Sequence, residues 1–416
     1  MADMWWKNAV IYTVDVERFC DSNGDGIGDF KGLTSKLSHV AELGATCIWL
    51  LPFFPSLGRD NGYDVTDYLR VDSRYGVFSD FLEFVHRAGE HGIRIIVDLV
   101  VHHTSDQHPW FQAARNNEES RYRDYYVWTH NPPPIKPGQG TMFPGEEKSV
   151  WTYDEVARAY YHHRFYHFEP GLNHANPQVR DEIERIFDYW ISFGISGFRI
   201  DAASHILEDP LVEDQAAAGE PDVLRELYRR AKSIRPDLVL LGEVDEAPEE
   251  LEKFFDGTRL NMMFNFMLDN YLILALAQQR SEPVERGLTL LPIPPENGQW
   301  ANFLRNLDEA DLERLTPMKS KPSSRSSRRK SACASMGAVY GAESPRCSRV
   351  THAGSRWPTA CCSPCRVRRW SSMATRSAWA MTWRNRAVVP SARRCSGPPA
   401  AMPAFRKRRP ASSCSR

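Results

Sequence analysis

Apolar runs rich in β-branched residues recur along the first three hundred positions, and helical patterns separate them. Uninterrupted runs of this kind are typical of parallel strands that are buried on both faces. Between two of them, Leu33, Leu37, Val40 and Leu43 recur at the spacing of an amphipathic helix. The pattern therefore predicts repeated βα units. The predicted strands are 9–18, 47–52, 94–101, 197–201, 238–243, 260–266 and 301–305.

A later helix has a start signal as well as a periodic pattern. Asn176 and Pro177 suit the N-cap and the first helical position. The apolar positions that follow at helical spacing are Val179, Ile183, Ile186, Phe187 and Trp190. Seven strands alternating with helices predict an α/β fold, the (β/α)8 TIM barrel, with one strand still to be placed. An open doubly wound sheet is the weaker alternative, because no glycine-rich phosphate loop follows the first strand.

Four of the apolar runs end in a carboxylate or an imidazole. They are DLVVHH (98–103), GFRIDA (197–202), LLGEV (240–244) and NFLRNLDE (302–309). In barrels of this type the chemistry is located at the C-terminal ends of the strands. We therefore expect these side chains to form one active site.

These segments resemble the α-amylase superfamily, glycoside hydrolase family thirteen, and within it the trehalose synthase and α-glucosidase branch. The similarity covers residues 5–317 and includes AVIYTVDVERFCDSNGDGIGDF, LLPFFPS, GYDVTDY and PGLNHANP besides the strand ends. The resemblance implies an enzyme that acts on small α-linked glucosides with retention of configuration. It favours interconversion of maltose and trehalose, and the alternative is hydrolysis by an α-glucosidase or oligo-glucosidase.

Retaining cleavage requires one carboxylate that attacks the anomeric carbon and one carboxyl group that protonates the leaving oxygen, about 5 Å apart. By resemblance Asp201 is the nucleophile, Glu243 is the general acid/base, and Asp308 is the third carboxylate of the site. Arg199 lies two residues before Asp201, on the same side of the strand. Its guanidinium should lower the pKa of Asp201, whereas the role of Glu243 requires a raised pKa.

Three further residues match the family's contacts in the first sugar subsite, namely Tyr63, Asp64 and His103. Tyr63 would offer its ring to a pyranose. The alternative for His103 is a buried imidazole without contact to sugar. Asp98 resembles a residue that supports the site without touching the substrate.

The chain departs from the family pattern at two positions. His102 stands where Asn is usual, and Leu307 stands where His usually precedes the third carboxylate. Because Leu cannot donate a hydrogen bond to a sugar hydroxyl, transition-state binding should be weaker or differently arranged. This favours, as a hypothesis of another class, an inactive truncated sugar-binding relative.

The loop DSNGDGIGD (21–29) is rich in oxygen ligands at short spacing. The candidate ligands are Asp21, Asn23, Asp25, the carbonyl of Ile27, and Asp29. Hard oxygen ligands in this pattern suit Ca²⁺, which would be structural, and the sequence suggests no organic cofactor. The alternative is an Asp/Gly turn held by Asx hydrogen bonds.

The chain divides into four segments. We predict a first barrel part at 1–103, an inserted B subdomain at 104–175, a second barrel part at 176–317, and a disordered basic tail at 318–416. The insertion should have a structure of its own, because a structureless loop of that length is improbable in a compact domain. Its aromatic residues could line the site or form its own core, and the second is the commoner arrangement.

The tail has a different composition from the rest of the chain. It holds 22 of the 52 Lys and Arg residues and one of the 53 acidic residues. The body is therefore near −22 and the tail near +21. A basic tail could bind nucleic acid, or Cys361, Cys362 and Cys365 could bind zinc.

A shifted reading frame is the third interpretation of the tail, and a decoding of its sequence favours it over the other two. With the frame moved back by one base, SMATRSAWAMTW (372–383) can read YGDEIGMGDDL, and ARRCSG (392–397) can read PPMQW. The segment at 361–372 can read LLFSLPGAPVVF in the same frame. These segments resemble the family's region around the eighth strand. The literal chain would then lack its native eighth strand and its C-terminal β-domain, and we expect poor stability and little activity.

Partners and compartment follow from composition. The acidic body argues against nucleic acid, and no apolar run is long enough to span a membrane. The start has no basic-then-apolar leader, and Cys20 and Cys47 alone make no disulfide framework. We expect a cytoplasmic protein that binds a small α-linked disaccharide or oligosaccharide; the sequence predicts no oligomeric state.

Overall fold

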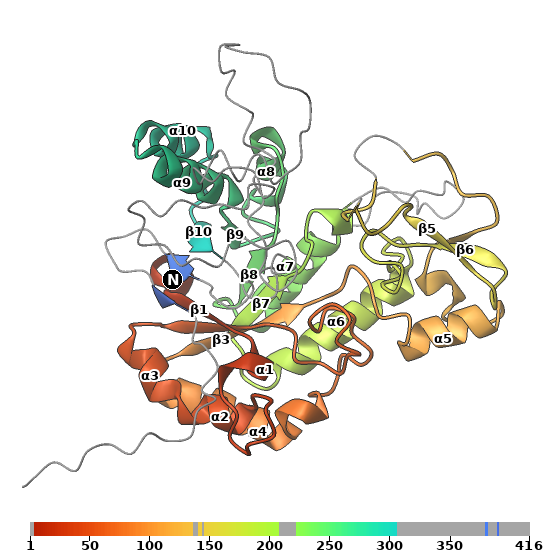
Figure 1. Ribbon diagram of the computed structural model, residues 1–416, viewed down its shortest axis with the longest axis horizontal. Helices are drawn as coiled ribbons and strands as arrows, with labels where there is room; N and C mark the ends of the chain where they lie inside the picture. The colour runs from red at the N-terminus through yellow and green to blue at the C-terminus, as the bar shows by residue number, and fades with distance from the viewer. Residues whose placement is uncertain are drawn as a thin grey trace, which may run out of the picture.

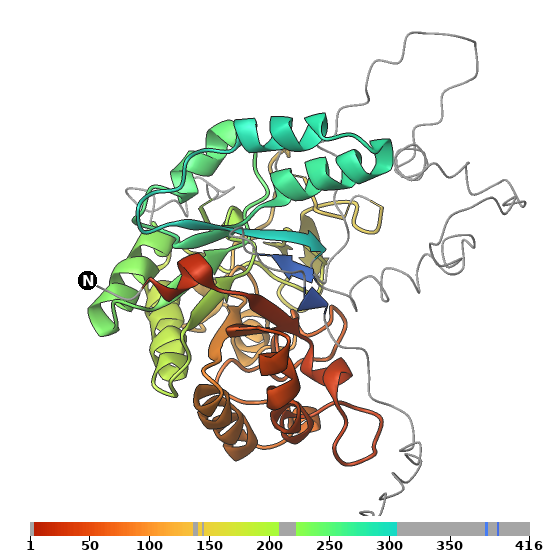
Figure 2. The same cartoon turned by 90° about the vertical axis from the view of Figure 1, so that its left-hand side faces the viewer.

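The computed structural model describes residues 4–135, 140–143, 145–207, 222–305, 379–381 and 389–390. Its main sheet curls into part of a cylinder, with the helices around its outside (Figures 1 and 2). Seven parallel strands follow one another in this sheet, which confirms a (β/α)8 type of fold. They are β1 (Ile11–Val14), β2 (Cys47–Leu50), β3 (Arg94–Leu99), β7 (Gly197–Ile200), β8 (Val239–Gly242), β9 (Met262–Phe264) and β10 (Gln299–Arg305).

The helices alternate with these strands. Along the barrel the α-helices are α1 (Val16–Phe19), α2 (Phe30–Ser35), α3 (Leu37–Glu42), α4 (Phe78–Glu90), α6 (Pro177–Ile191), α7 (Val223–Ile234), α8 (Pro248–Phe254), α9 (Phe266–Gln278) and α10 (Glu282–Leu290). Short 3-10 turns lie at Trp5–Asn8, Ser73–Tyr75, Arg123–Tyr125 and His205–Leu207. Among the described residues no helix is both long and apolar enough to cross a membrane.

Both faces of the sheet are buried, which explains why its strands are continuously apolar. One cluster fills the inside of the cylinder with alternate residues from six strands: Ile11, Cys47, Trp49, Ile96, Val239, Leu241, Met262, Phe264, Ala301 and Phe303, together with Trp6 and Ala9 before the first strand and Leu51 after the second. Alternate residues such as Tyr12, Ile48 and Leu240 belong to the larger cluster that includes the helices. The period-two alternation of strand side chains thus divides each run between two cores.

Helix α6 forms as its sequence predicts. The side chain of Asn176 caps it by accepting the backbone N–H of Gln178 at 2.9 Å, and Pro177 occupies the first turn. All five of the predicted apolar positions are buried. The loss of such a cap costs about 1 kcal/mol in typical helices.

The first predicted elements are shorter than expected. The strand predicted at 9–18 ends at Val14, and Val16–Phe19 forms the one-turn helix α1. Val16 and Phe19 are three positions apart, so one turn buries both against the core, which an extended chain would not do. The helix predicted around Leu33 to Leu43 is split at Lys36 into α2 and α3.

Residues 104–175 contain a small sheet of their own. Its antiparallel strands are β4 (Trp128–Thr129), β5 (Trp151–Asp154) and β6 (Ala159–His162), in the order β4-β6-β5, and α5 (Pro109–Asn116) precedes them. This lobe projects from one side of the barrel (Figure 1). Phe111 stacks on Trp128 with ring centroids 5.5 Å apart, and both are buried, so these rings form the lobe's core.

Two short segments of the tail are described. Strand β11 (Trp379–Met381) pairs antiparallel with β10, and β12 (Val389–Pro390) pairs with β11. Strand β11 also lies beside β1, so an antiparallel strand stands where a barrel would have its eighth parallel one (Figure 2). The remainder of the tail, including Cys361, Cys362 and Cys365, lies outside the described residues.

Candidate functional site

Strand register brings the polar strand ends together. Strand β7 lies between β3 and β8, and Asp98 of β3 stands opposite Arg199 of β7. The backbone N–H of Glu243 donates to the carbonyl of Ile200 at 3.1 Å, so Glu243 and Asp201 leave neighbouring strands at the same end. Gly197 permits this pairing, because a Cβ there would lie 2.1 Å from the carbonyl oxygen of Val239.

A single buried guanidinium joins three carboxyl groups. Arg199 Nη1 donates to Asp98 Oδ1 at 2.8 Å and also contacts Asp201 Oδ1. Arg199 Nη2 lies 2.7 Å from Glu243 Oε1. Because both carboxyl groups contact one guanidinium, the contacting oxygens of Asp201 and Glu243 lie no more than about 8 Å apart. That separation is compatible with a retaining pair of carboxyl groups.

Asp98 connects this cluster to two aromatic side chains. Its second oxygen, Oδ2, accepts Trp49 Nε1 at 3.1 Å and the hydroxyl of Tyr63 at 3.3 Å. The Arg199 guanidinium lies 5.3 Å from the centre of the Trp49 ring. The supporting role expected for Asp98 fits these contacts, since its side chain is fully buried.

The turn after β7 positions Glu243. Ala202 has a positive φ of 46°, which is uncommon for a residue with a side chain. In this conformation its backbone N–H donates to Glu243 Oε2 at 3.0 Å. The two oxygens of Glu243 are thus held by Ala202 and Arg199, while 25 % of the side chain remains exposed.

The electrostatics of Asp201 differ from the sequence-based expectation. Burial raises the pKa of Asp201 well above its ordinary value, and the nearby Glu243 and Asp98 add to this effect. Arg199 does lower the pKa of Asp201, as predicted, but its effect is smaller than that of burial. Burial thus favours the neutral form of Asp201, and Arg199 favours its carboxylate.

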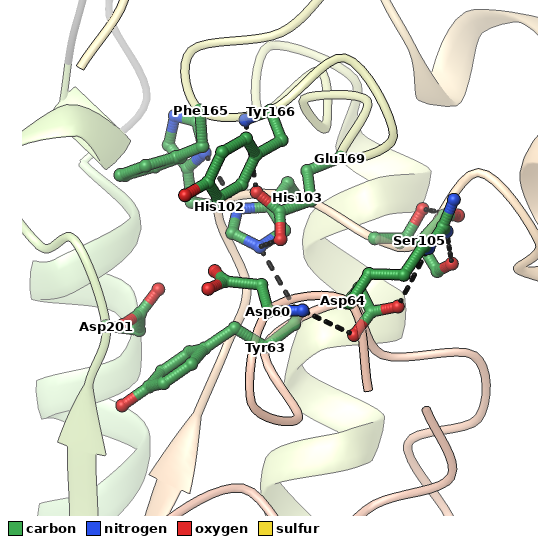
Figure 3. A network of polar contacts seen from close by, with 12 residues as sticks. Asp60, Tyr63, Asp64, His102, His103, Ser105, Phe165, Tyr166, Glu169 and Asp201 are labelled. Atoms are coloured by element: carbon green, nitrogen blue, oxygen red, sulfur yellow. Dashed lines mark hydrogen bonds and ion pairs between the residues drawn. The ribbon is translucent and has the colours of Figure 1, made fainter. Parts of the chain in front are cut away.

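The three residues predicted to contact a sugar differ in burial and in their contacts within the protein. Tyr63 is half-buried and lies with Asp201 at the site (Figure 3). His103 is buried, with Nε2 3.3 Å from the carbonyl oxygen of Tyr63. Asp64, in contrast, is fully buried and accepts Ser56 Oγ at 2.5 Å and Arg59 Nε at 3.2 Å. Asp64 therefore holds the loop in place, and its contact with a sugar stays a prediction.

Two acidic residues that the sequence reasoning missed lie at the site. Asp60 points toward Asp201, beside Tyr63, and Glu169 lies above His103 (Figure 3). Asp60 precedes the GYDV motif by two positions, and Glu169 begins the segment EPGLN. Neither follows a predicted strand, so no pattern marked them; the EPGLN segment was the nearest available signal.

His102, which stands where the family usually has Asn, is also buried. His102 packs edge-on against Phe165 at 5.1 Å, and its Nδ1 is 3.4 Å from Nδ1 of His103. Burial lowers the pKa of His102 well below its ordinary value, and that of His103 to about 4. Both are therefore neutral near pH 7. Asp308 and Leu307 lie outside the described residues.

The loop at 21–29 forms a compact turn. Asp21 accepts the backbone N–H groups of Asn23, Gly24 and Gly26, at 3.1, 2.7 and 2.8 Å. The N–H groups of Gly26 and Gly24 lower the pKa of Asp21 and keep it charged. The side chain of Asp29 accepts the N–H of Gly32 and so caps α2.

These contacts match the Asx-turn alternative for the loop. The oxygen ligands suit Ca²⁺ in type, yet within the described ranges no three His, Cys, Asp or Glu side chains form a metal-binding group. The Ca²⁺ site stays a prediction.

Comparisons with known proteins agree on a family. The pattern described as "Alpha amylase, catalytic domain" matches residues 11–292. A trehalose synthase from Thermus thermophilus is 41% identical over 321 residues, which cover 76% of this chain and 33% of that protein. A glucan 1,6-alpha-glucosidase from Streptococcus pneumoniae serotype 4 is 41% identical over 271 residues, covering 64% of this chain and 49% of that protein.

A solved structure gives the same result. The crystal structure of the trehalulose synthase MutB from Pseudomonas mesoacidophila MX-45 matches with a TM-score of 0.62 and 32% identity. The match covers 73% of this chain and 58% of that one. The chain thus spans between a third and about three fifths of these three proteins.

Proposed function

Because the chain belongs to the α-amylase family, we propose that it acts on small α-linked glucosides with retention of configuration, as a trehalose-synthase-like enzyme. One observation carries this proposal, namely the placement of Asp201 and Glu243 on the same buried guanidinium at the ends of neighbouring strands. Supporting it, trehalose synthases are among the similar proteins, and a MutB mutant was crystallised in complex with the substrate sucrose.

In the proposed first step, a carboxylate oxygen of Asp201 attacks the anomeric carbon while the bond to the leaving oxygen breaks. Glu243 donates its proton to that oxygen, which departs as a sugar hydroxyl. The product of this step is a glucosyl ester of Asp201.

In the second step, Glu243 takes a proton from an incoming hydroxyl group, and that oxygen displaces Asp201. If the hydroxyl belongs to the anomeric carbon of the released glucose, maltose becomes trehalose. If water attacks, two glucose molecules result. Asp308 would be the third carboxylate that binds sugar hydroxyls.

The test is incubation of maltose with the in-frame parent, in which the tail is read in the shifted frame, followed by chromatographic separation of trehalose from glucose. We expect trehalose to form, and Asp201→Asn and Glu243→Gln to abolish all products. Accumulation of glucose without trehalose would instead support an α-glucosidase, which the similarity to the glucan 1,6-alpha-glucosidase favours. If Glu243→Gln changes no measurable property, the protein is a sugar-binding relative without catalysis.

A further inference from the structure

Glu169 is a buried carboxyl group that contacts no charged cation among the described residues. Its side chain is fully buried, and Oε2 accepts the backbone N–H of Tyr166 at 3.2 Å. Oε1 receives no hydrogen bond from a donor among the described residues. The carboxyl group of Asp60 lies close to that of Glu169 (Figure 3), and its charge is one of the causes that raise the pKa of Glu169. Two ionised carboxylates buried so close together would repel each other, whereas one shared proton would join them.

Two basic side chains lie near this pair, His103 and Arg59, and within the described part of the chain neither donates a hydrogen bond to Glu169. His103 Nε2 lies 3.9 Å from Glu169 Oε1, but burial keeps this imidazole neutral near pH 7. Asp64 adds a negative charge on the other side of Asp60. The nearby guanidinium of Arg59 is engaged by Asp64 and Asp106. Full ionisation would therefore group the carboxylates of Asp60, Asp64 and Glu169 beside a guanidinium that already pairs with Asp64 and Asp106, which the low local dielectric disfavours.

We propose that Asp60 and Glu169 share a single proton, so that Glu169 is a buried hydrogen-bond donor that holds the Asp60 carboxylate toward the sugar site. This inference rests on the proposed function for the part that concerns sugar. Burial, followed by the charge of Asp60, raises the pKa of Glu169 to about 10, and burial raises that of Asp60 to about 6. Between these values the pair carries one proton and one negative charge.

The shared proton matters because Asp60 points toward Asp201 (Figure 3). If Glu169 were ionised as well as Asp60, it would add to the negative charge around Asp201. That charge would favour the protonated form of Asp201, which cannot attack. A single carboxylate at Asp60 can accept hydrogen bonds from the hydroxyl groups of a neutral glucosyl unit. Glu169 is thus a positioning residue, which acts through Asp60.

Infrared difference spectroscopy on the full chain tests the proton directly. At about pH 8 the unsubstituted protein minus Glu169→Gln should show a protonated carboxyl band. The matched control is Glu252→Gln, an exposed position on α8, whose difference spectrum should show only an ionised carboxylate. Overlapping spectra for the two variants would overturn the proposal.

Thermal unfolding gives a second readout that needs no sugar. The pKa of Glu169 is raised in the folded protein, so its contribution to stability is present below its unfolded pKa and is lost as pH rises toward about 10. The unfolding midpoint of the unsubstituted chain should therefore fall relative to that of Glu169→Gln between about pH 5 and pH 9. Parallel midpoints across this range would contradict a buried proton.

Calorimetric binding of maltose tests the positioning role. The amide of Glu169→Gln can donate to Asp60, so its affinity should stay within about threefold, whereas Glu169→Ala should lose about tenfold or more. Equal binding by Glu169→Ala would overturn the positioning of Asp60. If the unsubstituted chain binds no maltose, the proposed function fails, and the infrared result still decides whether the proton is shared.

Discussion

Replacement of Arg199 by Met should destabilise the protein in a manner that depends strongly on pH. The Arg199 side chain is 1% exposed and contacts Asp98, Asp201 and Glu243. Met keeps much of the volume but removes the one positive charge. Removal of one partner from a buried ionic network typically costs about 3–5 kcal/mol, because the remaining charges stay buried without compensation.

The pH dependence follows from the carboxyl groups that remain. Burial already raises the pKa of Asp98 to about 6 and that of Asp201 further, with Arg199 opposing both shifts. Without Arg199 these folded-state pKa values rise, while the unfolded values stay near 3.8. Carboxyl groups with raised pKa values stabilise the fold least at high pH. The deficit of the variant should therefore be small near about pH 4 and approach its full size near about pH 8.

Urea unfolding of both proteins across this pH range measures the deficit. Arg87→Met is the control, since Arg87 is half exposed and pairs with Glu83 and Glu90 on the surface of α4. Surface pairs of this kind contribute about 1 kcal/mol or less. A deficit below about 1 kcal/mol for Arg199→Met, or one that does not grow with pH, would refute the electrostatic account of the cluster.

Three further predictions concern stability. Ala202→Gly relieves the positive φ of 46° and should leave stability unchanged or raise it by up to about 1 kcal/mol; a loss above that in urea unfolding would show that the conformation is not strained. Trp128→Ala should cost about 3–5 kcal/mol, because it empties the core of the lobe beside Phe111, and calorimetry that shows no change in the lobe's unfolding would contradict this. Ca²⁺ should raise the unfolding midpoint of the chelator-treated protein, and Asp21→Ala should abolish the rise; equal midpoints with and without Ca²⁺ would leave the loop at 21–29 a metal-free turn.

The elements that could be predicted from the sequence are those with a strong period. Helix α6 combines a cap, a proline and five apolar positions, and all of these signals lie within one segment. The parallel strands could be placed because both of their faces are buried. The one-turn helix α1 and the break at Lys36 could not be placed, because a single turn has too few positions for a period to emerge.

The same distinction applies to the site, because its residues on or after strands could be predicted and those on loops could not. Asp201 and Glu243 follow neighbouring strands and Arg199 lies within one, so the topology of the barrel predicts their meeting. Asp60 and Glu169 are 109 positions apart in the sequence and both lie on loops, so only the folded chain shows that they lie close together (Figure 3). The raised pKa of Asp201 could not be predicted from the sequence either. Burial has a larger effect on it than Arg199, and the extent of burial depends on the whole fold.

The neighbouring strands β3 and β7 are separated in the chain by the whole lobe at 104–175 and by helix α6. A ribosome therefore has to synthesise about a hundred residues after Asp98 before its partner Arg199 emerges, and forty more before Glu243 does. Until then Asp98 lacks the guanidinium of Arg199, which it contacts in the folded protein. Contacts between segments so far apart in the chain form slowly, so the nascent chain completes the cluster around Arg199 late in folding.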